Sequence, residues 1–232
     1  MAIEDKIAAV NGLLEHIVRE YPGAAFATSF GAEDMVLLDF IARGFPAIEV
    51  FTLDTGRLPE ETHRLMQAAS ERYAIKIKVY YPEARSLENF VASNGIDPFY
   101  RSVELRRGCC HIRKVEPLKR ALEGKQAWIT GLRRDQALSR SDAREKDYDA
   151  QNGLYKFNPL VEWTLADTWD YIRRFDVPYN ALHDRGYPSI GCAPCTRAVT
   201  VGEDPRAGRW WWESPEGKEC GLHPRKPLEQ SA

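Results

Sequence analysis

Residues 24–34 read AAFATSFGAED, and this stretch decides the fold. The apolar run 24–28 predicts a buried strand, and residues 35–41 predict a helix that ends at Gly44. Between them Gly31 permits a tight turn, so that the first amides of the helix point toward any anion held by the loop. An ordinary strand-to-helix turn would have a similar sequence. The loop is not a Walker A loop, because the chain contains no G-x-x-x-x-G-K-[ST] motif.

The same alternation of strand and helix continues along most of the chain. It predicts an α/β fold, with a parallel sheet covered by helices on both faces. The polar residues 133–150 predict a loop. We expect further strands at 47–53, 75–80 and 127–132, and further helices at 3–19, 60–73, 86–93, 110–122 and 164–175.

Three predicted loops, at Ser29, Asp54 and Gly131, directly follow strands. Ligands of parallel sheets bind beyond the carboxyl ends of the strands, so these loops are expected to form the floor of one crevice. Residues 53–56, LDTG, would place a carboxylate and backbone against a base or ribose. They would equally suit the capped entry of a helix that begins near Pro59.

Composition limits the class of protein. The chain has 232 residues, of which 44% are hydrophobic and 28% charged, as in a soluble protein with one core. The net charge of −2 offers no general attraction for nucleic acid or an anionic membrane, so any anion must be held locally. No apolar run approaches the roughly 18 residues of a membrane span, and the N-terminus lacks the pattern of a signal peptide. We expect a cytoplasmic protein.

Five cysteines in a reducing compartment argue against a disulfide framework. Cys192 and Cys195 form a C-x-x-C turn typical of metal sites, and a thioredoxin-like redox pair is the rival interpretation. The adjacent Cys109 and Cys110 would diverge by about 100° on a helix. That divergence favours a cluster with a separate iron for each thiolate. Tetrahedral zinc and, for the adjacent pair, unliganded thiols remain alternatives.

The fifth cysteine, Cys220, lies near the C-terminus between Lys218 and His223, which favour its reactive thiolate form. The glycines and proline around it predict a segment that moves as a unit. A thiolate on such an arm would enter the crevice, attack, and leave carrying its adduct. An exposed cysteine without a role is the alternative.

These features together resemble the assimilatory adenylylsulfate reductases, relatives of the phosphoadenylylsulfate reductases, over nearly the whole chain. The combination of CC, CxxC and a terminal ECGLH is highly specific for this family. The matching stretches are SFGAED at 29–34, LDTGR at 53–57, CCHIRK at 109–114, GLRRDQ at 131–136, GCAPC at 191–195 and KECGLH at 218–223.

The resemblance implies the adenine-nucleotide hydrolase-like fold, a doubly wound parallel sheet. It implies a sulfonucleotide-binding domain at 1–200 and an arginine-rich, mobile tail with the catalytic cysteine at 201–232. The activity would be the thioredoxin-dependent reduction of adenosine 5′-phosphosulfate to sulfite and AMP, in sulfate assimilation and cysteine biosynthesis.

Residue roles also follow from the resemblance. A [4Fe–4S] cluster would be held by Cys109, Cys110, Cys192 and Cys195. Cys220 would be the nucleophile and would carry an S-sulfocysteine intermediate. The residues that match substrate-binding positions are Ser29, Phe30, Gly31, Leu53, Lys114, Gly131, Arg140, Arg206, Arg209 and His223.

Two departures from the family are visible. Some relatives carry an additional serine in the first loop, and the chain ends at Ala232 without the fused thioredoxin-like domain of the plant enzymes. A separate dithiol protein is therefore the expected reductant. A homo-oligomer is left open.

Three competing functions remain. A reductase of the 3′-phosphorylated nucleotide would share most motifs, although that branch commonly lacks the four cluster cysteines. An ATP pyrophosphatase of the same fold needs a Ser-Gly-Gly type loop, which SFGAED does not provide. A zinc module that binds nucleic acid would need a basic face, and the near-neutral charge counts against it.

Overall fold

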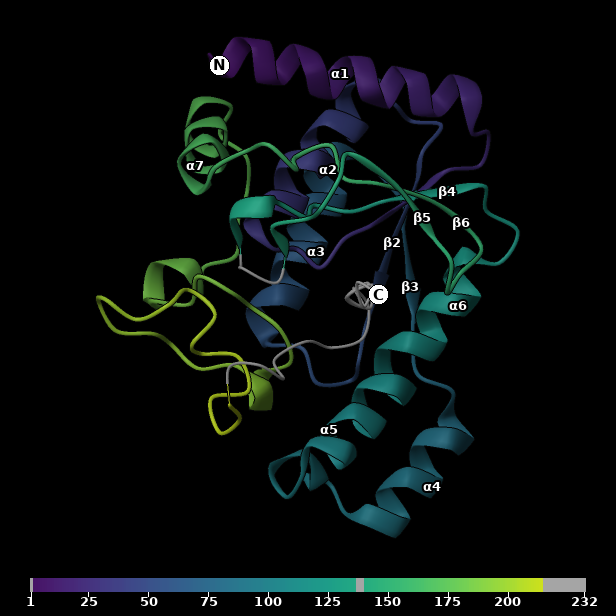
Figure 1. Cartoon of the computed structure of the whole chain (residues 1–232), viewed down its shortest axis with the longest axis vertical. Helices are drawn as coiled ribbons and strands as arrows, with labels where there is room; N and C mark the ends of the chain where they lie inside the picture. The colour runs from purple at the N-terminus through teal and green to yellow at the C-terminus, as the bar shows by residue number, and fades with distance from the viewer. Residues whose placement is uncertain (1, 137–139, 215–232) are drawn as a thin grey trace, which may run out of the picture.

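The computed structural model describes residues 2–136 and 140–214. At its centre lies a six-stranded sheet in the order β3-β2-β1-β4-β6-β5, with helices on both faces (Figure 1). The strand order reverses beside β1, so the sheet is doubly wound, as expected. Five strands run parallel: β1 (Ala25–Ala27), β2 (Glu49–Leu53), β3 (Ile77–Tyr80), β4 (Ala127–Ile129) and β6 (Leu154–Phe157).

The prediction of a loop at 133–150 is wrong for the second half of this stretch. Residues Lys146–Asp149 form β5, which pairs antiparallel with β6 across a turn at Gly153, where φ is +73°. The sequence of β5 is KDYD, and its residues are at most half-buried because it is an edge strand. A polar edge strand lacks the apolar alternation on which the prediction depended.

Successive residues along the inner strands point to opposite faces of the sheet. Phe26 and Val50 contribute to one core with α1 (Ile3–Glu20), α2 (Ala32–Gly44), α3 (Glu60–Tyr73) and α7 (Leu165–Arg174). Their neighbours Ala25 and Phe51 pack with Trp128 against α6 (Glu116–Leu122) on the other face. The predicted helices at 3–19, 35–41, 60–73 and 164–175 are confirmed.

The prediction that the cysteine pair lies at the start of a helix is wrong. It ends α5 (Val103–Cys110), which Ser102 caps by accepting from the Leu105 amide at 3.2 Å. A π-helical turn (His111–Val115) joins α5 directly to α6. The α5 helix escaped prediction because a buried residue of its core-facing side is Arg106 and not an apolar residue.

The remaining helix, α4 (Ala84–Asn94), lies beside α5 at the lower end of Figure 1. None of the helices in the described ranges is long and apolar enough to cross a bilayer. Short 3₁₀ turns occupy Pro98–Tyr100, Arg134–Gln136, His183–Arg185 and Ala193–Cys195.

One carboxylate is completely buried in the main core. Asp39, in α2, has no exposed surface and accepts from the Tyr73 hydroxyl at 2.8 Å, the Tyr171 hydroxyl at 2.9 Å and the Arg43 Nε at 2.9 Å. Burial and the neighbouring carboxylate raise the pKa of both phenols, which therefore stay protonated and donate. Asp39 thus ties α2 to α3 and α7.

Asp39→Ala should therefore lower the free energy of unfolding by about 2–4 kcal/mol, because it removes the acceptor of the buried Tyr171 hydroxyl and of the partly buried Tyr73 hydroxyl. Urea unfolding of anaerobically purified protein measures this loss. Arg43→Ala is the matched control. The Arg43 side chain is more than half exposed, and without it both phenols still donate to Asp39, so its removal should cost less than the loss of Asp39. Equal losses in the two variants would contradict the role given to the two tyrosine hydroxyls.

Candidate functional site

A cavity of about 410 Å³ lies at the carboxyl ends of β1, β2 and β4. The strand ends supply its floor, as the sequence predicted. The segment 188–191 and the segment 205–210 supply a second wall from far along the chain. The floor residues are Thr28 and Ser29 after β1, Leu53 and Thr55 at and after β2, and Thr130 and Gly131 after β4.

Most of the substrate-binding residues expected from the sequence line this cavity. Phe30 does not, since its side chain is 1% exposed and belongs to the main core. Cys220 and His223 fall outside the described residues. The eight that line the cavity are Ser29, Gly31, Leu53, Lys114, Gly131, Arg140, Arg206 and Arg209.

The first loop is fixed by a carboxylate from its own helix. The Ser29 amide and hydroxyl donate to one oxygen of Asp34 at 2.6 and 2.7 Å. Phe30 adopts a φ of +60°, which is uncommon for a non-glycine residue, and its buried ring holds it there. Gly131 approaches the same carboxylate so closely that a Cβ atom would overlap it. Two strand ends are therefore locked together at Asp34.

Burial raises the pKa of Asp34 to about 6, while the hydrogen bonds from Ser29 oppose this shift. Below pH 6 the carboxyl is largely neutral, and above it the negative charge returns to the cavity floor. The residue belongs to the SFGAED stretch, yet it was not predicted as a site residue. A carboxylate in the first turn of a helix is equally typical of a simple cap.

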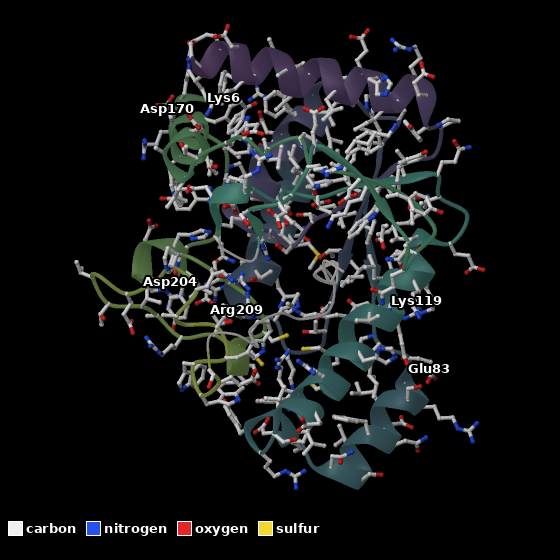
Figure 2. The ribbon with its side chains drawn as sticks, in the orientation of Figure 1. Lys6, Glu83, Lys119, Asp170, Asp204 and Arg209 are labelled. Carbon is white, nitrogen blue, oxygen red and sulfur yellow. The ribbon has the colours of Figure 1, made fainter. Side chains whose placement is uncertain are left out.

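Four basic side chains also line the cavity. Lys114 comes from the π-helical turn, Arg140 from the loop after β4, and Arg206 and Arg209 from the C-terminal segment. In Figure 2, Arg209 lies toward the middle of the molecule, whereas Asp204 of the same segment is exposed at the edge. Two of the three acids that line the cavity are paired, because Arg133 binds Glu33 at 2.8 Å and Asp135 at 3.2 Å; the third acid is Asp34.

Arg209 is held rigidly. Its Nη1 donates to the Ile190 carbonyl at 3.0 Å, and its guanidinium fills the space that a side chain at Gly191 would need. Its Nε is buried and has no hydrogen-bond partner among the described residues. A buried donor without a partner is costly, and an anion in the cavity would provide an acceptor.

The four cysteines at 109, 110, 192 and 195 are free thiols packed together next to the cavity. Three of them form an apolar cluster with Phe99 and Trp210, and Cys109 packs against it. The Thr55 hydroxyl lies 3.2 Å from the Cys192 sulfur, which connects this cluster to the loop after β2. The α5 helix and the C-x-x-C turn thus bring together two pairs more than 80 positions apart in the sequence.

The environment of these thiols fits ligands of a shared metal group. Burial raises the pKa of Cys195 to about 12, and Cys192 and Cys110 add to the shift, while Lys114 and Arg209 oppose it. The same three cysteines pack in one buried cluster. In the described ranges no three His, Cys, Asp or Glu side chains are arranged to hold a single ion. Four adjacent thiols beside cationic groups suit a four-thiolate cluster.

His183 and Trp210 also line the cavity and were not predicted as site residues. The His183 Nε2 is buried without a hydrogen-bond partner among the described residues, and burial lowers its pKa. No sequence motif marks this histidine. Of the three consecutive tryptophans, Trp210 is 1% exposed and part of the site, whereas Trp211 is 40% exposed.

Comparisons with known proteins agree with this geometry. The phosphoadenosine phosphosulfate reductase domain matches residues 23–198. The adenosine 5′-phosphosulfate reductase of Allochromatium vinosum is 53% identical over 227 residues, which cover 97% of this chain and 89% of that protein.

Two solved structures have folds similar to that of this chain. The phosphoadenylyl-sulfate reductase of Candida auris, solved with phosphate, is 30% identical and superimposes with a TM-score of 0.70 over 82% of this chain and 90% of its own. The ammonia-dependent NAD synthetase of Campylobacter jejuni, 12% identical with a TM-score of 0.56, covers 81% of this chain and 79% of its own and shares the fold alone. The domain match and the extent of identity show that the chain belongs to the adenosine 5′-phosphosulfate reductases, a family of oxidoreductases that act on sulfur.

Proposed function

We propose that this protein reduces adenosine 5′-phosphosulfate to sulfite and AMP in sulfate assimilation, with thioredoxin or a similar dithiol protein as reductant. One observation carries the proposal: four basic side chains, Lys114, Arg140, Arg206 and Arg209, converge on a cavity at the carboxyl ends of the strands. Such a cavity suits a nucleotide whose far end carries several negative oxygens.

The nucleoside would lie over the strand ends. Ser29, Leu53 and Gly131 line this floor, where the base and ribose would lie. The close contact of Gly131 with Asp34 keeps this floor rigid, so it would bind without rearrangement.

The phosphosulfate would then point at the four basic side chains that line the cavity. Its oxygens repel an incoming thiolate, and guanidinium groups lower that repulsion by pairing two oxygens at once. The charge of Lys114 and the three arginines is the main contribution of the described residues to the reaction.

The nucleophile would be Cys220, on the segment 201–232, which we assign as the arginine-rich tail of a domain spanning 1–200. Its thiolate attacks sulfur, the bond from sulfur to the phosphate oxygen breaks, and AMP leaves with that electron pair. The product is S-sulfocysteine. A thiolate of the reductant next attacks the Cys220 sulfur and expels sulfite, which leaves a mixed disulfide. The second thiol of the reductant attacks this mixed disulfide, forms the reductant's own disulfide and releases the Cys220 thiolate. The dithiol supplies the two electrons.

The four thiols at 109, 110, 192 and 195 would hold a [4Fe–4S] cluster. When bound, the cluster supplies charge beside the sulfate end of the cavity. Free thiols in this number fit the reducing cytoplasm, where we place the protein.

Cys220→Ser should abolish sulfite formation, because serine is a far weaker nucleophile than a thiolate. Mass spectrometry of the native protein mixed with substrate, without reductant, should show an added SO₃ on Cys220 and none on the variant. The variant should still bind the nucleotide and keep its absorbance near 400 nm. Normal turnover by the variant, or an adduct on another cysteine, would refute the assignment.

The choice of substrate is tested separately. Anaerobically purified protein with thioredoxin should release sulfite from adenosine 5′-phosphosulfate much faster than from its 3′-phosphorylated form. The reverse preference would favour the phosphoadenylylsulfate alternative, and pyrophosphate release from ATP would favour an ATP pyrophosphatase.

Cys192→Ser should lower the iron content and the absorbance near 400 nm, because it removes one of four thiolate ligands. Iron and zinc analysis of anaerobically purified protein measures the change. Stoichiometric zinc with no absorbance near 400 nm in the native protein would support the zinc alternative. A native protein with neither metal would contradict both.

Gly191→Ala should reduce kcat/KM by about ten- to a hundredfold, because its Cβ would displace the Arg209 guanidinium from the cavity wall. Gly12→Ala is the matched control, since a Cβ at Gly12, on α1, meets no atom within 4 Å. The control should keep the native rate. A Gly191→Ala variant with native kinetics would show that the observed position of Arg209 is not required.

A further inference from the structure

Arg106 is a fully buried arginine that does not line the cavity. It lies on α5, one helical turn before Cys110. Its Nε and Nη2 donate to the two carboxylate oxygens of Glu213 at 2.9 and 2.8 Å. Both side chains are at most 5% exposed, so this is a buried, two-pronged ion pair between α5 and the C-terminal segment.

The same guanidinium also lies over the ring of Trp210. Its Cζ is 4.8 Å from the ring centroid, and the Cζ of Arg209 lies at the same distance from that ring. The Glu213 amide donates to the Trp210 carbonyl at 2.9 Å, which closes the chain from 210 to 213 into a turn. Arg106 therefore holds both ends of this turn, the indole at its start and the carboxylate at its end.

The turn is connected on both sides to parts of the site. Before it, Arg209 lines the cavity, and the Trp210 amide donates to the Cys195 carbonyl at 3.1 Å. After it, the sequence reaches Cys220 seven residues beyond Glu213. A shift of this turn would move Arg209 and the point from which the nucleophile's segment departs.

We propose, on the basis of the function proposed above, that Arg106 is a positioning residue that keeps Arg209 directed at the sulfate through the Trp210–Glu213 turn. It does not touch the substrate. Arginine is required because one planar group must pair two carboxylate oxygens and also stack on an indole. A lysine would keep the charge but could not do both.

The test measures sulfate recognition directly, in a Cys220→Ser background where no turnover occurs. Isothermal titration gives the dissociation constants of adenosine 5′-phosphosulfate and of AMP, which lacks the sulfate. Arg106→Met should reduce the preference for the sulfated nucleotide by about tenfold or more, while the affinity for AMP stays nearly constant. In the Cys220 protein the same substitution should raise KM and lower the rate of SO₃ transfer per cluster.

Arg107→Met is the matched control, because Arg107 is the exposed neighbour on the same helix. It should leave the preference unchanged. Glu213→Gln provides a second variant of nearly identical shape, in which the amide nitrogen cannot accept from Arg106. It should show a smaller loss of preference, and it decides the matter if Arg106→Met does not fold.

The outcomes separate the two proposals. If the Cys220→Ser protein binds the sulfated nucleotide no better than AMP, the result contradicts the proposed function and the role of Arg106 with it. If the Cys220→Ser protein prefers the sulfated nucleotide and keeps this preference with Arg106→Met and with Glu213→Gln, the result overturns the role of Arg106 alone. Variants that lose thermal stability or absorbance near 400 nm but keep the preference overturn it as well, since they show a structural role only.

Discussion

The site depends on keeping a guanidinium group away from water and in one place. Arg209 meets this constraint from three sides: Gly191 leaves room for it, the Ile190 carbonyl accepts from it, and the Trp210 ring lies beside it. A freely moving arginine would lose side-chain entropy on binding an anion, and a solvated one would attract it weakly. The glycine before the C-x-x-C turn is therefore explained by the cavity and not only by the turn.

The sheet provides the floor of the cavity, and core packing fixes its position. Alternate residues of β1, β2 and β4 are buried on both faces, so the strand ends cannot shift without disturbing two cores. Asp34 then joins the loop after β1 to the loop after β4. Core packing thus fixes the floor of the cavity, while the Ile190 carbonyl and the Trp210 ring hold Arg209 in its lining.

Much of this could be predicted from the sequence, because the inner strands and the helices of the main core follow regular apolar patterns. The exceptions have physical causes. The strand β5 is polar since it lies at an edge, and α5 was missed because Arg106 occupies a buried position. The sequence motifs also predicted most of the expected substrate-binding residues that line the cavity. His183 and the partnership of Arg106 with Glu213 could not be predicted, since they depend on contacts between residues far apart in the chain.

The four buried thiols also bear on which cysteine can react. Without a metal, burial raises the pKa of Cys109 and of Cys195, so these thiols stay protonated and are poor nucleophiles. With a cluster bound, the same sulfurs are committed to iron. Of the four, Cys109 and Cys195 are therefore unsuited to supply the attacking thiolate. Cys220 is the one cysteine in the sequence outside the four, which agrees with the nucleophile proposed above.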